Sequence, residues 1–313
     1  MTNTTEPQTT SAPRAHLHAM APLIAAAYVL VYLAWGGTFL GIRVAMETIP
    51  AFLMAGSRFL IAGLILLTGI RLLRSSQFRW GTPREWRDAS VVGLLMVLMG
   101  NGGITWSERV LPSGVAALVV ALTPLWMVLF DWLRPAGQRP SLQTAFGLLL
   151  GFGGICVLRG SDHGGAGSEA LNWSFLVLFI GNICWGAGAI YSRHAHAEGS
   201  PLLPVARQMV IGGVALLTVS AVSGEFQTFS FAAISLRSAL GYTYLITFGS
   251  LLGFTAYVWL MKVSTPARVG TISYVNPIIA VLLGWSFGGE DMTLKMAASA
   301  VIIVIAVVIV IRR

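Results

Sequence analysis

Apolar residues along this chain form long blocks, separated by short polar and basic segments. A helix rises about 1.5 Å per residue, so about 20 mostly apolar residues cross the roughly 30 Å hydrocarbon core of a bilayer. Backbone polar groups in lipid must be satisfied within the segment, so each block is expected to be a helix. The pattern predicts ten transmembrane helices, at residues 22–42, 51–71, 89–107, 113–133, 142–158, 171–192, 201–222, 238–260, 266–287 and 293–311.

The first half of this pattern returns about 150 residues later. A long internal period made of apolar segments indicates two homologous helical bundles. We therefore divide the chain into a disordered tail at residues 1–20, a first repeat at 21–160 and a second repeat at 171–313. The matched features are Trp35-Gly36 followed by Arg43, with Trp185-Gly186 followed by Arg193, and Thr123-Pro124 with Asn276-Pro277.

Lysines and arginines test the number of spans, because cytoplasmic loops carry an excess of them. When successive loops are assigned to alternating sides of the membrane, thirteen basic residues fall on one side and five on the other. Arg58 and Arg207 lie inside spans. This bias places both termini in the cytoplasm. Five helices per repeat is an odd number, so the second repeat enters the membrane from the opposite side, which is the inverted arrangement of many secondary transporters.

Composition agrees with an all-α membrane protein. The chain is 56% hydrophobic and 10% charged, with a mean hydropathy of +0.77, whereas soluble domains carry about 25% charged residues. The formal charge of +8 follows from topology and does not indicate a nucleic-acid partner. Cys156 and Cys184 lie in apolar spans, so no disulfide or zinc framework is implied.

No catalytic constellation stands out in the sequence. We find no phosphate-binding loop, nucleophile group or metal-ligand cluster, and the histidines fall in tails or loops. The sequence therefore predicts no catalytic residues, no metal and no cofactor, and a protein that is not an enzyme.

Pro124 and Pro277 lie inside the fourth and ninth predicted helices, at matched positions of the two repeats. A proline removes one helical hydrogen bond and frees a carbonyl about one turn earlier. Each proline alone is either a packing kink or a hinge at which substrate meets polar backbone. Their matched positions favour the second interpretation.

Polar side chains within the spans are candidates for a substrate cavity. Asn101 and Asn182 either form interhelical hydrogen bonds, worth about 0.6 to 2 kcal/mol, or line a cavity. Arg58 and Arg207 lie about seven residues into their helices. They either extend to the membrane surface or face the cavity, where they would favour a solute with an anionic group.

Aromatic residues occur at the same depth. Trp126 and Tyr274 flank the two prolines, and Trp35 and Trp185 lie deep in the first and sixth helices. Such rings hold amphipathic solutes by stacking or cation–π contact, although Trp and Tyr also anchor helix ends at the membrane interface.

Acidic residues lie at or beyond the ends of the predicted helices, Glu108 and Glu290 among them. Proton- and sodium-coupled carriers commonly hold such groups within the membrane. Facilitated diffusion, or coupling through a group near a helix end such as Glu108, is therefore expected rather than a buried carboxylate relay.

The chain resembles the drug/metabolite transporter superfamily, specifically its bacterial EamA-domain permeases. The motifs that carry the resemblance are AWGGT with Arg43, RFLIAG around Arg58, LPSGVAAL at Leu111 to Leu118, Thr123-Pro124, and Tyr274-Val275-Asn276-Pro277 followed by Gly289-Glu290. The first repeat lacks the Gly-Glu pair that the second has at Gly289-Glu290.

The resemblance implies ten helices in two inverted five-helix repeats, an inner-membrane location, and export of small metabolites such as amino acids or related amphipathic compounds. It also implies a central cavity and supports as its lining Trp35, Asn101, Thr123, Trp185, Tyr257, Tyr274 and Asn276.

We therefore expect an exporter that works by alternating access, with the lipid bilayer and a small-molecule substrate as its partners. Two alternatives remain: a multidrug exporter of lipophilic compounds, and a membrane-embedded enzyme. Gly37-xxx-Gly41, Gly147-xxx-Gly151 and Gly284-xxx-Gly288 indicate close helix packing within the bundle. The protein is expected to be a monomer or a homodimer.

Overall fold

The structure, a computed structural model, describes residues 20–134, 139–159, 168–195 and 197–311. The regular structure of these residues is entirely helical. The helices are α2 (Ala21–Gly36), α3 (Thr38–Ala45), α4 (Ala51–Leu73), α5 (Pro83–Val92), η2 (Gly93–Asn101), α6 (Gly102–Ser107), α7 (Ser113–Val120), α8 (Thr123–Leu133), α9 (Leu142–Arg159), α10 (Ser168–Ser192), α11 (Leu202–Val222), α12 (Glu225–Thr228), α13 (Leu236–Tyr244), η4 (Leu245–Leu252), α14 (Gly253–Val263), α15 (Pro266–Val269), α16 (Ile272–Phe287) and α17 (Leu294–Ile311).

These helices confirm the predicted all-α membrane fold. Eight continuous stretches of the described residues are long and apolar enough to cross a bilayer. Two shorter apolar helices, Leu142–Leu158 and Ile272–Phe287, occupy the positions of the fifth and ninth predicted spans. The predicted tail at residues 1–20 lies outside the described residues except for Met20.

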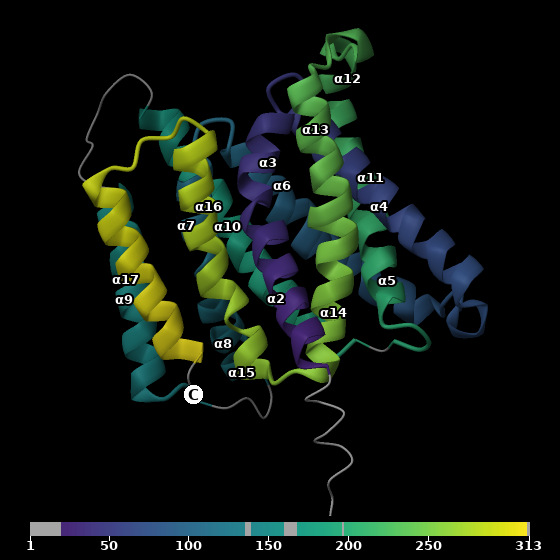
Figure 1. The fold of residues 1–313 in the computed structure, drawn as a ribbon, viewed down its shortest axis with the longest axis horizontal. Helices are drawn as coiled ribbons and strands as arrows, with labels where there is room; N and C mark the ends of the chain where they lie inside the picture. The colour runs from purple at the N-terminus through teal and green to yellow at the C-terminus, as the bar shows by residue number, and fades with distance from the viewer. Residues whose placement is uncertain (1–19, 135–138, 160–167, 196, 312–313) are drawn as a thin grey trace, which may run out of the picture.

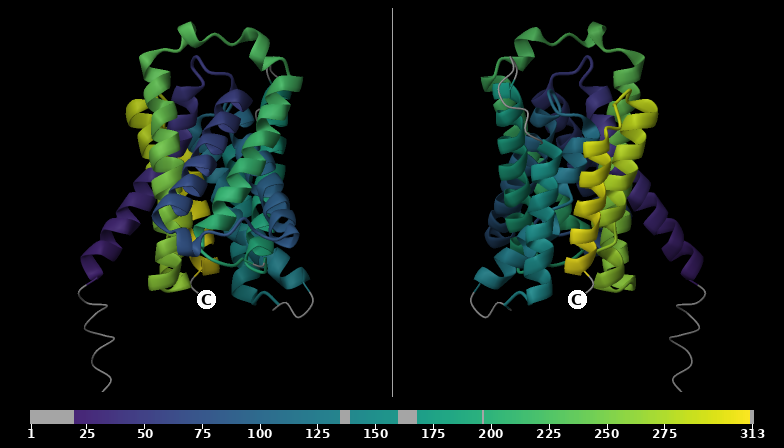
Figure 2. Two further views of the ribbon diagram at one scale, coloured as in Figure 1. Left: turned by 90° about the vertical axis from the view of Figure 1, so that its right-hand side faces the viewer. Right: turned by 90° about the vertical axis from the view of Figure 1, so that its left-hand side faces the viewer.

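The helices form one bundle whose two ends differ (Figure 1). α2 begins and α17 ends at the lower end in this view, whereas α12 lies at the opposite end. The segment that contains α12 arches over that end between α11 and α13 (Figure 2). The start of α2 and the end of α17 therefore lie at the same end of the bundle, and the side of the membrane that this end faces stays a prediction.

Side chains are distributed as a lipid solvent requires. Large apolar side chains such as Leu149, Phe146 and Leu33 are exposed on the outside of the bundle. Polar and charged groups such as Arg58, Asn101 and Asn182 are buried inside it. Lipid tails are as apolar as leucine, so close packing and interhelical hydrogen bonds, rather than hydrophobic burial, hold such helices together.

The predicted glycine motifs pack within the chain. A Cβ on Gly147 would meet Val310 and Ala306 of α17, and one on Gly41 would meet Tyr244 and Leu245. A Cβ on Gly284 would meet Glu290, just beyond the end of its own helix, and Ser113 at the start of α7. These short approaches confirm that the motifs bring helices of one bundle together.

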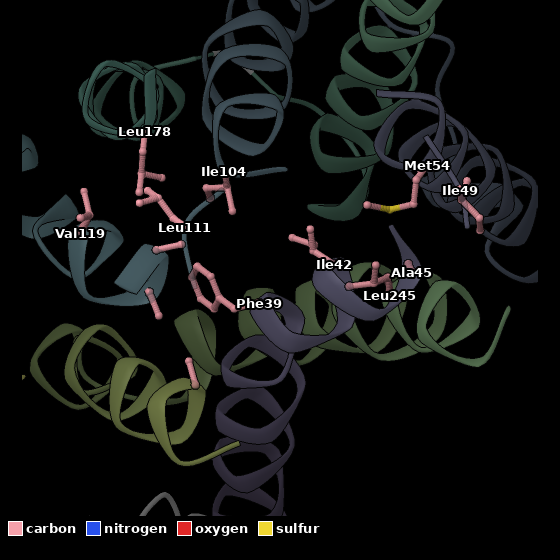
Figure 3. Close-up of a cluster of buried hydrophobic side chains, with 13 residues drawn as sticks. Phe39, Ile42, Ala45, Ile49, Met54, Ile104, Leu111, Val119, Leu178 and Leu245 are labelled. Atoms are coloured by element: carbon pink, nitrogen blue, oxygen red, sulfur yellow. The ribbon is translucent and has the colours of Figure 1, made fainter. Parts of the chain in front are cut away.

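An apolar cluster fills the bundle between the two repeats (Figure 3). Phe39, Ile42 and Ala45 of α3 are its central members, and they meet Ile104 of α6 and Leu245 of η4. The cluster also contains the buried Ile49, Met54, Leu111, Ala116, Ala117, Val119, Leu178 and Ala280. α3, which supplies these central members, lies in the half of the bundle that bears α12 (Figure 1).

The fourth and ninth spans are both broken, but not in the same way. α7 ends at Val120 and α8 begins at Thr123, so Pro124 lies in the first turn of a new helix, where proline is tolerated. In the ninth span the break falls at Gly270 and Thr271, between α15 and α16, and Pro277 lies inside α16. The two matched prolines therefore have different local settings.

Candidate functional site

The third and eighth spans each contain a π-helical segment, which the hydrophobic pattern did not predict. η2 continues α5 as far as Asn101, and η4 continues α13 as far as Leu252. Hydrogen bonds in a π-helix join residues five apart, and such segments are frequent at functional sites. Because the segment occurs once in each repeat, we place the candidate site around η2 and η4.

Trp35, a predicted cavity residue, lies against the π-helical segment of the other repeat. Its indole Nε1 donates to the carbonyl of Gly249 in η4 at 3.1 Å. Its ring lies 5.2 Å from that of Phe254 and 5.0 Å from that of Tyr257, between ring centroids. Tyr257, the second predicted residue here, thus belongs to the same aromatic group.

Trp185 occupies the equivalent position with the repeats exchanged. A Cβ on Gly100 of η2 would lie 2.7 Å from the ring of Trp185, just as a Cβ on Gly253 would lie 2.6 Å from Trp35 Nε1. Each tryptophan of one repeat therefore needs a glycine next to the π-helical segment of the other.

A second pair of contacts repeats in the same way. Gly36, next to Trp35, packs against Ile279 of α16, and Gly186, next to Trp185, packs against Trp126 of α8. Ile279 and Trp126 each lie two residues after their proline. The internal match read from the sequence is thus also a match of contacts.

Thr123 and Asn182 compensate for the break at Pro124. The proline frees the carbonyl of Val120, and the Thr123 hydroxyl lies 2.6 Å from that oxygen and 2.5 Å from Asn182 Oδ1, donating to one at a time. Asn182 Nδ2 donates to the carbonyl of Val119 at 2.8 Å. This arrangement is the interhelical hydrogen bonding that was one of the two readings of Asn182.

Trp126 lies in an aromatic group with Phe152 at 5.5 Å and Phe179 at 5.2 Å. Its Nε1 is buried and has no hydrogen-bond partner among the described residues. Asn276 Oδ1 is likewise buried and unpaired within the described part of the chain. Tyr274 is half-buried, beside the cluster that contains Leu118 and Val281. Unpaired polar atoms of this kind are available to a ligand.

Arg58 is buried in the middle of the candidate site, with 3% of its surface exposed. Its Nη2 donates to Asn101 Oδ1 at 3.4 Å, and the guanidinium lies 4.2 Å from the ring centre of Phe59. Asn101 Nδ2 donates in turn to the Met96 carbonyl in η2 at 3.2 Å. Arg58 Nε and Nη1 are buried and have no partner in the described residues, so two charged donors remain unused.

Arg207, the matching residue of the second repeat, is placed differently. Its side chain is 1% exposed and pairs with Glu85 at 3.2 Å, while Nη2 donates to the Arg79 carbonyl at 2.7 Å. The ring of Trp86 lies 5.7 Å from the guanidinium carbon. These contacts tie α11 to the start of α5. Glu85 is the third residue of α5, and the third residue of α13 in the other repeat is Ser238. Serine carries no charge, so this position offers Arg58 no carboxylate like the one that pairs with Arg207.

Three carboxylates join helix ends of the two repeats, and the sequence pattern did not reveal their partners. Glu290 accepts from Ser113 N at 2.7 Å and Gly114 N at 3.1 Å, at the start of α7, and pairs with Arg43 at 3.3 Å. A carboxylate at a helix N-terminus satisfies orphan N–H groups and complements the helix dipole.

Glu225 acts on α4 as Glu290 acts on α7. It accepts from Phe52 N at 3.2 Å and Leu53 N at 2.8 Å. Gly224 and Gly289 precede the two glutamates with φ of 78° and 64°, a left-handed conformation that favours glycine. The Gly-Glu dipeptide was the available sequence signal for both, and Glu85 is the third carboxylate.

Two hollows lie toward opposite ends of the bundle. One, of about 600 Å³, is lined by Asp88 of α5, Tyr191 of α10, and Arg134 and His194 just beyond the ends of α8 and α10, with their neighbours. The other, of about 520 Å³, is lined by Glu47, Trp106, Arg109 and Glu225 with their neighbours. The apolar cluster of Figure 3 lies between the chain's halves near the second hollow.

Comparison with known proteins also indicates two copies of one unit in this chain. Residues 22–160 and residues 172–312 each match the sequence model of the EamA-like transporter family. The chain is 36% identical over 291 residues to "Uncharacterized inner membrane transporter YedA" of Escherichia coli strain K12, covering 92% of this chain and 90% of that protein. It is 28% identical over 279 residues to "Uncharacterized transporter YvbV" of Bacillus subtilis strain 168, covering 88% and 87%.

A solved crystal structure has the same fold, with a TM-score of 0.64 at 20% sequence identity. The match covers 92% of this chain and 96% of the other. At this identity the likeness concerns the fold alone.

Proposed function

Because this chain belongs to the EamA-like transporter family, we propose that it exports small metabolites, such as amino acids or related amphipathic compounds, by alternating access around a central cavity. It is a multi-pass membrane protein, and its relatives carry the names of inner membrane transporters. The proposal adds to these facts a substrate class, a direction and a site. It also places both chain ends in the cytoplasm, on the side where thirteen basic residues gather.

The observation that carries the proposal is the burial of Arg58 with two donor nitrogens that have no partner among the described residues. A buried guanidinium with two unused donors is costly unless an acceptor reaches it. Asn101 fixes the guanidinium on the π-helical segment η2, and the remaining donors Nε and Nη1 suit a carboxylate or another planar anion. An anionic or zwitterionic solute is therefore the substrate class that this site fits.

Two features support alternating access. Hollows lie toward both ends of the bundle, and the apolar cluster around Phe39 and Ile42 includes Ile49, which also lines the second hollow. The two tryptophans of the first and sixth spans each contact the opposite repeat, so movement of one repeat changes the surroundings of both. This arrangement supports a rigid-body rocking of the repeats around a fixed site.

A second candidate function is export of lipophilic cations. Such a solute needs a buried carboxylate, and Glu108 is buried with 4% of its surface exposed. Its position beside Arg58 makes the same site less favourable for a cation, because the two positive charges would repel. We therefore place this function second.

The proposal is tested by a metabolite screen in proteoliposomes, with and without a pH gradient. We expect flux of at least one amino acid or small carboxylate above the rate in protein-free liposomes, and little flux of lipophilic cations. Liposomes without protein provide the background rate. Flux of lipophilic cations alone would favour the second candidate, and flux of neither class would contradict both.

Substitution of Arg58 tests the site itself. Arg58→Ala is expected to lower flux of the anionic or zwitterionic solute by about tenfold or more, because charge-assisted hydrogen bonds contribute about 1.5 kcal/mol or more each. Arg237→Ala, which removes an exposed ion pair with Glu47, is the control and should leave flux unchanged. Equal losses of flux and of folded protein in Arg58→Ala would assign Arg58 to folding instead.

A further inference from the structure

Glu108 is a buried carboxyl group whose oxygens accept no hydrogen bond from the described residues. It directly follows the span Pro83–Ser107 and ends α6, and 4% of its surface is exposed. Neither Oε1 nor Oε2 has a partner within the part of the chain that the structure describes. The buried Glu85 and Glu290, by contrast, are each held by backbone N–H groups and an arginine.

The charged groups that face Glu108 are Glu290, Arg43 and Arg58. Glu290 and Arg43 already pair with each other. Arg58 keeps Nε and Nη1 unused, and Tyr242, which faces Arg58, donates its own hydroxyl to Ser57 at 2.7 Å. The Glu108 carboxyl group and the Arg58 guanidinium thus lie near each other, each with unused hydrogen-bonding atoms, and do not pair in this conformation.

An ionised carboxylate in these surroundings would be costly, and such a group takes up a proton instead. Burial raises the pKa of Glu108 well above its usual range, and Glu290 raises it further, while Arg43 and Arg58 lower it. The geometry and the electrostatics agree that this conformation holds the neutral acid.

We propose that Glu108 is a proton-binding site, and that its proton travels together with a substrate anion bound at Arg58. This inference rests on the proposed function. An ionised Glu108 and a substrate anion compete for the guanidinium of Arg58, so protonation of Glu108 leaves that guanidinium to the substrate. The proton binds to a carboxylate oxygen from water on one side and returns to water on the other, and no other bond forms or breaks.

The coupling has a direction. A proton and a monoanion that move together carry no net charge, and outward movement of the pair is driven by the substrate gradient and opposed by an inward proton gradient. Flux of the anion should therefore slow when the side to which it moves is made more acidic.

Infrared titration of the protein in lipid nanodiscs tests the proton site without any substrate. Between about pH 5 and about pH 9, we expect a protonated-carboxyl band near neutral pH that is lost in Glu108→Gln and displaced in Glu108→Asp. Glu47→Gln, at an exposed ion pair, should keep the band. Arg58→Gln should raise its midpoint by about one pH unit or more. Wild-type protein with no such band near neutral pH would overturn the proposal, whether or not the variants fold.

A pH-sensitive dye inside proteoliposomes tests the coupling, with succinate and L-alanine as probes and protein-free liposomes as the background. We expect a change of internal pH during flux of a probe in wild-type protein, and flux without that change in Glu108→Gln. Wild-type flux without a pH change would overturn the coupling but leave the proposed function standing. No wild-type flux would overturn the proposed function and the coupling with it, while the infrared result would still decide the proton site.

Discussion

Replacing Glu85 by Ala is expected to lower the free energy of unfolding by about 3 to 5 kcal/mol, which is the effect of removing one partner from a buried ion pair. The side chain of Arg207 is 1% exposed and would keep its charge with one acceptor fewer. Glu85 also accepts from Thr82 N at 2.7 Å and from Glu198 N at 3.1 Å. Its loss would therefore also loosen the start of α5 and the segment before α11.

The matched control is Glu47→Ala. Glu47 pairs with Arg237 at 3.2 Å, but both side chains are well exposed, at 39% and 61%, and such pairs contribute about 1 kcal/mol or less. Thermal unfolding of the purified proteins in one detergent compares the two. Similar small losses of thermal stability in both variants would contradict a structural role for the buried pair and would return Arg207 to the list of cavity candidates.

The contrast between Arg58 and Arg207 shows how far sequence alone could reach. Both arginines lie about seven residues into matched helices, and the sequence treats them alike. The difference comes from Glu85, which lies far from Arg207 in the sequence and has Ser238 at the equivalent position of the other repeat. A pairing between distant segments leaves no periodic signal, so the two roles could not be separated beforehand.

The spans themselves were predictable because lipid imposes a strict rule on length and hydropathy. Several predicted boundaries agree closely with the helices, for example 51–71 with Ala51–Leu73 and 293–311 with Leu294–Ile311. The third span, predicted from residue 89, begins at Pro83 instead. The internal match of Trp35 with Trp185 was predictable for a different reason. Close contacts with glycine restrict the tryptophan and the glycine in each repeat, so both residues recur in the sequence.

Other features depend on tertiary structure. A π-helical segment has the same apolar composition as an α-helix, so the sequence of Gly93–Asn101 does not distinguish the two. Glu108 follows a helix end, which in sequence suggests contact with water, yet the helix ends that surround it bury it. The sequence could suggest that coupling runs through a group near a helix end. It could not predict that Glu108 is buried beside Arg58.

Contact between α4 and α11 gives the second large expected effect. The two helices meet at Gly56 and Gly213, and a Cβ on Gly213 would lie 2.6 Å from Leu60 N and 2.9 Å from Gly56 O. Backbone atoms cannot move aside as a flexible side chain can, so Gly213→Ala must separate the helices. We expect a loss of about 1 to 3 kcal/mol in the free energy of unfolding, as for other overpacked interiors.

Gly69→Ala is the control within α4. A Cβ there meets nothing within 4 Å, and replacing Gly by Ala in a helix stabilises it by up to about 1 kcal/mol. Thermal unfolding should therefore show Gly213→Ala well below wild type and Gly69→Ala at or above it. If Gly213→Ala unfolded at the wild-type temperature, the close approach of α4 and α11 would be wrong.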